Sequence, residues 1–500
     1  MSWMTPSGTA RQQAIGGAMG SLGGEISSIF VNPAGLGFYK NMEIVLTPGY
    51  RWTKTKGSYR ESDFMTLKNA NSFQLGTTGF VGGWSDKYSK WKSKAIGIAV
   101  NQTANFNKDV LYSGSNDYSS WTENPTNEFF NYYTLHKNAN PLMTDAAIVN
   151  NALGDAGVSL PTKMGLYTYL IDIDSSTGQK RIVSRAEEVG LLDQSNHIRT
   201  RGGVTEIALA FAANMDDKLY IGGTFGVPIV NYKSESTFTE RDATGGTANK
   251  FNYFSYQENY ESKGVGINAK LGMIFKPKDY VRLGLAIHTP TLYGLTDTYS
   301  SKMVTDVENR FAPATGLDSV NSTVFTNNAA NEFNYDLSSP WKFIVSGSYV
   351  FREVEDITRQ KGFITADIEY TNYAWSSFSS AEANSDDSYY KGVNSDINDA
   401  YRGTFNFRVG GELKFKTIMT RLGFAYYGNP YSDKSLNAKH MLVSGGLGYR
   451  NKGMFIDLTY VQQLNKDVNF PYRLTPPRQN TFAELKENGG NLMLTVGFKI

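Results

Sequence analysis

The sequence contains few residues that could carry out catalysis. It has no cysteine, and its four histidines, His136, His197, His288 and His440, are far apart in the chain. The sequence motifs of a serine hydrolase, a phosphate-binding loop and a zinc peptidase do not occur in it. A hydrolase that uses His288 or His440 is the enzymatic alternative. We expect no enzyme activity, no bound metal and no cofactor.

Charged side chains instead recur at every second position of apolar segments. In residues 281–288, for example, Arg282 and His288 alternate with valine, leucine and isoleucine. This alternation is typical of a strand with one apolar and one polar face. Both signs of charge occur on the polar faces, so these charges can pair with one another across an interior. The candidate ligand-contacting residues on these faces are Arg51, Arg282, Arg408, Arg421 and His288.

The composition excludes several classes of protein. Lys and Arg number 49 and Asp and Glu number 47, which leaves a net charge of +2, so nucleic acid is not an expected partner. No apolar run is long enough to cross a bilayer as a helix. The 49 glycines, 31 tyrosines and 29 phenylalanines are also more than a disordered chain would carry.

About fourteen segments show the two-residue alternation, and each has about the 9–11 residues that a tilted strand needs to cross hydrocarbon. They begin near Met42, Phe73, Lys94, Gly203, Leu219, Gly264, Val281, Trp341, Gly362, Gly403, Ile418, His440, Met454 and Asn491.

The connections between these segments alternate in length. Links after even-numbered segments are short, such as 216–218 and 451–453, whereas links after odd-numbered segments are mostly long and polar, such as 108–201 and 234–262. Up-and-down barrels in outer membranes have this alternation. We therefore predict an all-β protein in the bacterial outer membrane, with a 14-stranded antiparallel transmembrane β-barrel over residues 42–500 that crosses the bilayer many times. A string of soluble β-sandwiches is the alternative, and it would require composition breaks that the chain lacks.

Residues 1–41 do not alternate. Residues 9–24 are rich in small side chains, residues 25–31 are predicted to form a short amphipathic helix, and Asn32-Pro33-Ala34-Gly35 ends it. A barrel of fourteen strands is wider than its own side chains can fill, since about eight strands give that condition. We therefore predict that residues 1–41 form a hatch, or plug, inside the lumen. The alternative is a flexible tail.

These N-terminal residues also carry a resemblance. Gly8-Thr9-Ala10-Arg11, Gly16-Gly17-Ala18 and above all Asn32-Pro33-Ala34-Gly35-Leu36 are similar to the hatch of the FadL/TodX family of outer-membrane transporters for hydrophobic compounds. Weaker similarities extend through the strands, for example at 281–285 and 408–412. The resemblance implies a gate at Asn32, Pro33, Ala34 and Gly35, and an inward kink of the third strand within residues 99–105.

By this resemblance the protein is expected to be an outer-membrane channel. It would take up a hydrophobic or amphipathic small molecule, similar to a long-chain fatty acid, by gated passive diffusion through a plugged barrel with a lateral opening. Expected partners are that ligand, outer-membrane lipid and lipopolysaccharide, but not nucleic acid. The large 108–201 insertion, with aromatic runs and a predicted helix at 144–153, departs from the family. The alternative function is therefore a structural or docking subunit that binds other outer-membrane or surface proteins through its long loops.

Overall fold

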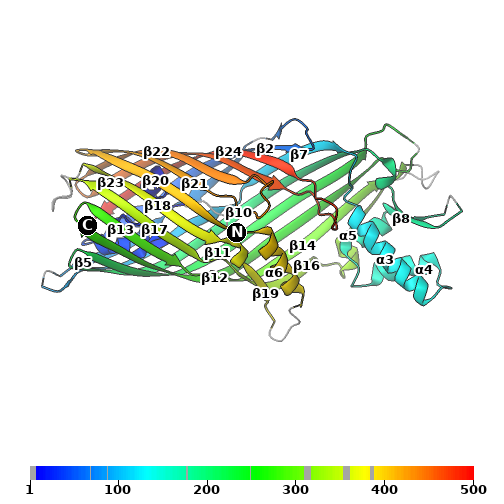
Figure 1. Ribbon diagram of the computed structural model, residues 1–500, viewed down its shortest axis with the longest axis horizontal. Coiled ribbons are helices and arrows are strands. Elements are labelled where there is room, and N and C mark those ends of the chain that lie inside the picture. Colours follow the sequence, from blue (N-terminus) through cyan, green and yellow to red (C-terminus); the bar gives the residue numbers. More distant parts are fainter. Residues whose placement is uncertain are drawn as a thin grey trace.

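The structure is a computed structural model that describes residues 7–67, 69–86, 88–175, 178–247, 249–308, 317–352, 361–382 and 388–500. Its strands form a closed antiparallel barrel whose wall has 14 segments (Figure 1). The wall closes because the last strand pairs with the first two, with Glu43 opposite Lys499. The predicted fold class and number of strands are thus confirmed.

Six of the wall segments are divided into two strands, and eight are continuous. In chain order they are β1 and β2 (Glu43–Leu46, Pro48–Tyr59), β4 and β5 (Ala70–Leu75, Thr78–Ser85), β6 and β7 (Trp91–Asn105, Lys108–Asn116), β10 (Leu192–Met215), β11 (Leu219–Asp242), β12 (Tyr253–Lys278), β13 and β14 (Val281–His288, Leu292–Asp306), β16 and β17 (Asn331–Ser338, Lys342–Phe351), β18 and β19 (Gly362–Asn372, Ser377–Ser380), β20 (Gly403–Phe415), β21 (Ile418–Tyr427), β22 (Lys439–Asn451), β23 (Met454–Asn469) and β24 (Ala483–Lys499).

The outer face of the barrel carries an apolar band. On β11 the outward side chains of Ile221, Phe225 and Ile229 are 40%, 52% and 41% exposed, which suits a surface covered by lipid. Farther along the same strand, Lys233 and Glu235 are exposed in the same outward row. The apolar band therefore ends near Ile229, and the rest of β11 extends beyond the membrane.

Several predicted loops are in fact strand. β12 has 26 residues, far more than the predicted 9–11, and most of the predicted 234–262 loop belongs to β11 and β12. The reason is physical: beyond the bilayer the outward row of these strands contacts water and carries residues such as Lys233 and Glu235. Apolar residues such as Phe238 and Phe254 face inward there, in a buried cluster, so the outward apolar alternation that marks a membrane strand is lost. The predicted 108–201 loop is likewise strand at both ends, in β7 and β10.

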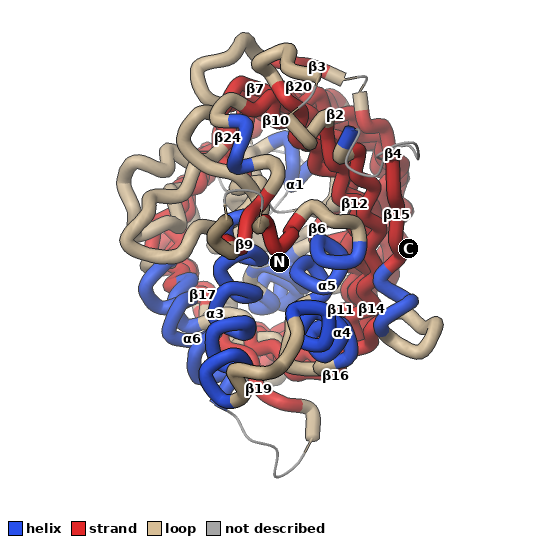
Figure 2. Tube along the Cα trace, turned by 90° about the vertical axis from the view of Figure 1, so that its right-hand side faces the viewer, coloured by secondary structure: helices blue, strands red, loops and turns tan. Residues whose placement is uncertain are grey.

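Residues 117–175 and 178–191, here called the cap, lie at one end of the barrel (Figure 2). The cap contains α3 (Glu123–Ala139), α4 (Asp145–Gly154), α5 (Leu160–Tyr167), the β8–β9 hairpin (Ile171–Asp174, Arg181–Ser184) and the short helix η2 (Glu187–Val189). The helix predicted at 144–153 is confirmed as α4, whose first turn is capped by the Thr144 hydroxyl. The indole of Trp121 packs 4.6 Å from the ring of Tyr256, a residue of the wall.

The N-terminal segment lies inside the ring of strands. It comprises α1 (Ala10–Ala14), α2 (Ser28–Val31) and the 3-10 helix η1 (Pro33–Phe38). Ala10 N–H donates to Thr495 of β24 at 2.8 Å, and Thr224 of β11 donates to a carbonyl of α2 at 2.9 Å. These bonds connect the segment to two strands that are far apart in the wall.

The helix predicted at 25–31 is shorter than expected. Only Ser28–Val31 is helical, because the carboxylate of Glu25 accepts hydrogen bonds from Thr9 Oγ1 at 2.7 Å and from Ser27 N at 2.9 Å. These bonds hold Glu25 outside the helix. The remaining short elements are β3 (Met65–Thr66), β15 (Leu317–Asn321), η4 (Ser322–Phe325), η6 (Tyr373–Trp375) and α6 (Ser388–Ala400). Among the helices of the described ranges, none has both the length and the apolar character needed to span a membrane.

Candidate functional site

Asn32 fastens the N-terminal segment to the wall. Its Oδ1 accepts a hydrogen bond from Ala34 N at 3.1 Å and so caps η1. Its Nδ2 donates to Gly20 O at 2.6 Å and approaches Met273 O and Leu285 O, both at 3.2 Å. This one buried amide thus joins two parts of the segment to β12 and β13.

The wall is recessed where η1 touches it. A Cβ atom added to Gly222 would lie 2.5 Å from the carbonyl carbon of Pro33, and one added to Gly272 would lie 1.9 Å from Asn32 Oδ1. Only glycine permits the Pro33 backbone and the Asn32 side chain to approach the wall backbone so closely. The four predicted gate residues, Asn32, Pro33, Ala34 and Gly35, are all buried beside this contact. Their gating role stays a prediction.

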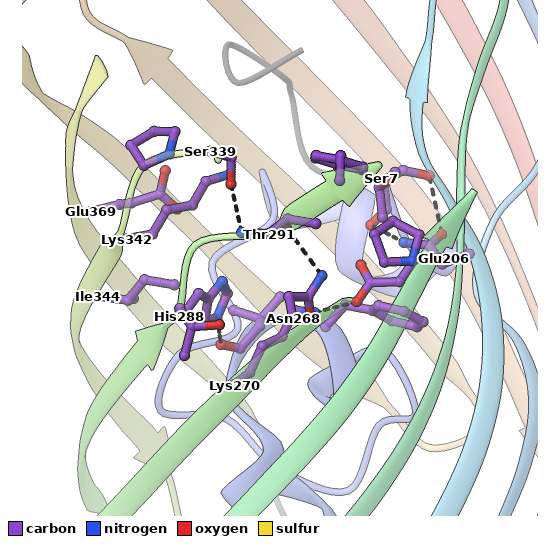
Figure 3. A pocket seen from close by; sticks show the side chains of 18 of the residues that line it. Ser7, Glu206, Asn268, Lys270, His288, Thr291, Ser339, Lys342, Ile344 and Glu369 are labelled. Carbon is purple, nitrogen blue, oxygen red and sulfur yellow. Dashed lines mark hydrogen bonds and ion pairs between the residues drawn. The ribbon is translucent and has the colours of Figure 1, made fainter. Parts of the chain in front are cut away.

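A cavity of about 140 Å³, here called the plug cavity, lies between the N-terminal segment and the wall (Figure 3). Its polar lining includes Glu206 and Lys270, which form an ion pair, and Arg408, whose Nη1 lies 2.9 Å from Glu369 Oε2. In Figure 3 Glu206 lies on the side opposite Lys342 and Glu369.

Two further cationic or titratable groups line the plug cavity. His288 Nε2 is 2.8 Å from Val31 O, a carbonyl that can only accept, so Nε2 carries the hydrogen. Lys342 also lines the cavity. Among the described residues its ammonium has no hydrogen bond and no ion pair within 4 Å, and it is attracted at longer range by the Glu369 carboxylate.

A second cavity of about 350 Å³, here called the polar cavity, shares Ser7 and Thr103 with the plug cavity. Arg51 and Lys108 line it, and they flank Glu487 at 3.5 and 3.0 Å. Most other lining residues are uncharged and polar.

The five candidate lumen residues separate into three places. Arg408 and His288 line the plug cavity, and Arg51 lines the polar cavity. Arg282 and Arg421 line neither. The guanidinium of Arg282 lies 4.8 Å over the ring of Phe38, and Arg421 bridges two buried carboxylates. The alternation along a strand predicts which side chains face inward. It does not predict which of them the N-terminal segment covers.

The ladder of wall hydrogen bonds is interrupted beside both cavities. β5 pairs with β6 only as far as Thr78 opposite Val100, and β4 pairs with β2 but not with β6 within the described wall. On β6, Thr103 is an extra residue between the pairs of Gln102 and Ala104, a β-bulge. Asn105 Nδ2 donates to Ser72 Oγ at 3.1 Å across the interruption. We call the interruption between β4 and the end of β6, at Ser72 and Asn105, the ladder gap. The bulge lies in the range where the resemblance implies a strand kink.

A buried carboxylate lies under the cap. Glu240 is fully buried and accepts hydrogen bonds from Ser120 Oγ at 2.6 Å, Trp121 N at 2.8 Å and Gln194 Nε2 at 2.7 Å. Because Glu240 lies beyond Glu235 on β11, it is outside the membrane. Burial raises the pKa of Glu240 to about 7, although the three hydrogen bonds act in the opposite direction.

The fold and the apolar outer band define a transmembrane β-barrel of the bacterial outer membrane. Known barrels share this fold over the whole chain. A FadL homologue from Pseudomonas aeruginosa has a TM-score of 0.55 at 12% identity, with 100% of this chain and 99% of that chain covered. The toluene transporter TodX of Pseudomonas putida has a TM-score of 0.52 at 13% identity, with 99% of each chain covered. The toluene transporter TbuX of Ralstonia pickettii has a TM-score of 0.50 at 13% identity, with 100% and 99% covered.

The resemblance inferred from the N-terminal residues is thus confirmed at the level of the fold. By sequence, no protein-family model and no curated protein matches the chain. Within the described ranges, no group of three or more His, Cys, Asp or Glu side chains could hold a metal ion.

Proposed function

We propose that this protein is an outer-membrane channel that takes up hydrophobic or amphipathic small molecules by gated passive diffusion. In this proposal residues 1–41 act as the plug, residues 42–500 form the barrel, and the ladder gap is the lateral exit. The observation that carries the proposal is the position of the gap, where an interrupted strand ladder adjoins two cavities lined by the N-terminal segment. The similar barrels described as toluene transporters support the class of ligand.

A lateral exit suits an apolar ligand for energetic reasons. Taking an acyl chain from apolar surroundings into water costs about 0.8 kcal/mol per methylene, or roughly 12 kcal/mol for a chain of sixteen carbons. An exit through the wall delivers the chain to lipid and avoids that cost. A water-filled pore would impose it.

The lining of the plug cavity favours an amphiphile that carries an acidic group. Phe30, Val31 and Leu337 supply apolar surface, and the ammonium of Lys342, which makes no close ion pair among the described residues, supplies positive charge beside His288. A carboxylate would pair with Lys342, while its chain would lie on the apolar residues. This chemistry is that of a long-chain fatty acid, whereas toluene offers no group for Lys342.

The decisive experiment uses the absence of native cysteine. Ser72→Cys with Asn105→Cys places two thiols across the ladder gap, where the native side chains already touch at 3.1 Å. We expect oxidation of this pair to abolish oleate uptake by proteoliposomes, and reduction to restore it. The matched control is Thr296→Cys with Asn334→Cys, which replaces an exposed cross-strand contact of 2.7 Å and should leave uptake unchanged.

The outcomes separate two parts of the proposal. If the unmodified protein fails to take up oleate or toluene, the proposed function is wrong. If it takes up oleate and the oxidised Ser72→Cys, Asn105→Cys variant does so equally well, the exit lies elsewhere.

One observation favours the alternative of a docking subunit. Phe130 and Leu135 of α3 and Leu142 after it are 54%, 67% and 92% exposed on the cap, which is unusual for large apolar side chains in contact with water. A docking role predicts that Phe130→Ser and Leu142→Ser abolish stoichiometric co-purification of another surface protein while oleate uptake remains intact.

A further inference from the structure

The polar cavity differs in chemistry from what a hydrophobic ligand would need. On its inner wall, three adjacent strands present polar side chains in one row, with His440 opposite Asn465 and Asn465 opposite Glu487. Gln463 and Asn491 continue the same surface. An apolar molecule at this place would bury these groups without hydrogen bonds, at a cost of about 1–3 kcal/mol for each. The polar cavity therefore does not match the ligand of the plug cavity.

Two buried amides on β23 belong to the lining of this cavity and have unused acceptor oxygens. Gln463 is 5% exposed and Asn465 is 6% exposed, and both line the cavity. Among the described residues, none donates a hydrogen bond to Gln463 Oε1 or to Asn465 Oδ1. Buried polar atoms are nearly always hydrogen-bonded, so these two oxygens indicate a partner that donates hydrogen.

The orientation of the Asn465 amide is fixed by its neighbour. Asn465 Nδ2 donates to Glu487 Oε1 at 3.1 Å, and a flipped amide would place two acceptors against each other. Oδ1 must therefore face away from the carboxylate. On the adjoining strand, Asn491 already accepts from Gln74 at 2.7 Å and donates to Gln13 at 3.0 Å. The amide of Asn491 thus has hydrogen-bond partners within the protein, whereas the amide oxygens of Gln463 and Asn465 have none among the described residues.

The charges of the polar cavity balance. Arg51 and Lys108 lie on either side of Glu487, and Asp467 is a second carboxylate in the lining. Two positive and two negative charges leave no net attraction for an anion or a cation. The ligand that fits is therefore neutral, donates several hydrogen bonds and accepts others from Arg51 and Lys108. Hydroxyl groups do both.

We infer that the polar cavity is a binding site for a neutral polyhydroxylated molecule of the saccharide class, held by the amides of Gln463 and Asn465. Its volume of about 350 Å³ is at the lower end of the range of about 300–1,000 Å³ for ligand pockets, which suits a small saccharide. The rings of Phe106 and Tyr232 also line it and supply apolar surface for the C–H faces of a sugar ring. Lys108, whose side chain is 25% exposed, marks a side reached by solvent. This site is distinct from the acyl-binding plug cavity.

The test is calorimetric titration of maltose, trehalose and glucose into the purified full-length protein in a detergent without a sugar headgroup. We expect at least one of the three to bind, and Gln463→Leu and Asn465→Leu each to weaken that binding about tenfold or more, as expected for a lost buried hydrogen bond. Lys342→Met, which alters only the plug cavity, should leave saccharide binding unchanged. Heat-modifiable migration on gels verifies that each variant retains the folded barrel.

A variant with a polar side chain guards against misfolding of the leucine variants. Asn465→Asp keeps the size of the side chain but places a charge beside Glu487, and it should also weaken binding. The inference is overturned if none of the three saccharides binds, or if binding is unaffected by Gln463→Leu and Asn465→Leu. It is also overturned if Lys342→Met weakens saccharide binding as much as those variants do. Loss of oleate uptake in Lys342→Met would concern the proposed function alone.

Discussion

Ser7 and Asn101 are 94 positions apart in the chain and are joined by two hydrogen bonds. Ser7 Oγ donates to Asn101 Oδ1 and Asn101 Nδ2 donates to Ser7 O, both at 3.3 Å. Ser7 lines both cavities, and Asn101 lines the plug cavity one strand position before the residues of the β-bulge. This pair therefore lies where the N-terminal segment separates the plug cavity from the polar cavity and from the ladder gap.

Asn101→Ala should loosen this separation. The variant loses both bonds, each worth about 0.5–1.5 kcal/mol net, so we expect faster oleate uptake, by up to about tenfold. Backbone amides next to Ser7 should also exchange hydrogen faster. Asn334→Ala, which changes an exposed side chain far from the cavities, is the control and should do neither. An unchanged exchange rate in Asn101→Ala would contradict the separating role of the pair.

Gly222 and Gly223 provide a matched test of how the wall holds the N-terminal segment. A Cβ atom on Gly222 would meet the Pro33 backbone at 2.5 Å, whereas a Cβ atom on Gly223 would have ordinary contact with Leu271 at 3.5 Å. Gly222→Ala should therefore destabilise the protein by about 1–3 kcal/mol, and Gly223→Ala should change stability by less than about 0.5 kcal/mol. Urea titration of the two refolded proteins, with hydrogen exchange at residues 33–38, distinguishes these outcomes. Equal losses of stability in the two variants would show that the close backbone contact at Gly222 does not hold η1 against the wall.

The strands could be predicted from the sequence because lipid imposes a strict pattern. Outward positions such as Phe225 and Ile229 must be apolar, and inward positions such as Glu206 are polar, so alternation identifies each crossing. Beyond the membrane this constraint ends, and the outer half of β12 was therefore predicted to be loop. The length of a strand in water depends on pairing with its neighbours, which a single segment does not reveal.

The site could be predicted only in part. The resemblance of Asn32-Pro33-Ala34-Gly35 to the hatch of a known family identified Asn32. Arg408 and His288 were identified because they alternate with apolar residues on predicted strands. Gln463 and Asn465 carry no such signal, since an amide on a polar face looks the same whether the protein satisfies it or not. That difference arises from neighbours on β22 and β24, which only the fold brings together.

Asn32 should be essential for seating η1. Asn32→Ala removes a fully buried amide that has four hydrogen-bond partners, and leaving such groups unpaired costs about 1–3 kcal/mol each. Asn32→Asp should be worse, because it sets carboxylate oxygens against the Gly20, Met273 and Leu285 carbonyls. We expect both variants to assemble as barrels and to show altered oleate uptake, with η1 less protected from hydrogen exchange. Wild-type uptake by both variants would refute the gate at Asn32.

Arg421 should contribute stability rather than ligand binding. Its Nε and Nη1 lie 2.6 Å from Glu412 and Asp457, and all three side chains are at least nine-tenths buried. Arg421→Met would leave two buried carboxylates without this partner, so we expect a loss of about 3–5 kcal/mol in unfolding free energy. Lys233→Met, which breaks the exposed pair with Glu261, should cost less than about 1 kcal/mol. Urea unfolding of both variants measures the difference. A small effect of Arg421→Met would mean that the carboxylates find other partners.

Glu240 should make the docking of the cap depend on pH. Its pKa is about 7 under the cap, whereas a carboxyl group in water has a pKa of about 4.3. Between about pH 4.5 and about pH 7, Glu240 is therefore protonated when the cap is docked and ionised when the cap is undocked. Across this range the undocked state binds fewer protons, so docking weakens as pH rises, by at most about 1.4 kcal/mol per pH unit, and stays constant above the range.

Limited proteolysis and hydrogen exchange of residues 117–191 test this dependence. We expect the cap to be better protected at about pH 5 than at about pH 8, and Glu240→Gln, which keeps a neutral side chain of the same size, to remove most of the difference. Glu235→Gln, on the exposed outer face of the same strand, should leave the difference intact. Protection that increases with pH in the native protein would contradict the assignment, because a buried carboxyl group with a raised pKa can only weaken docking as it loses its proton.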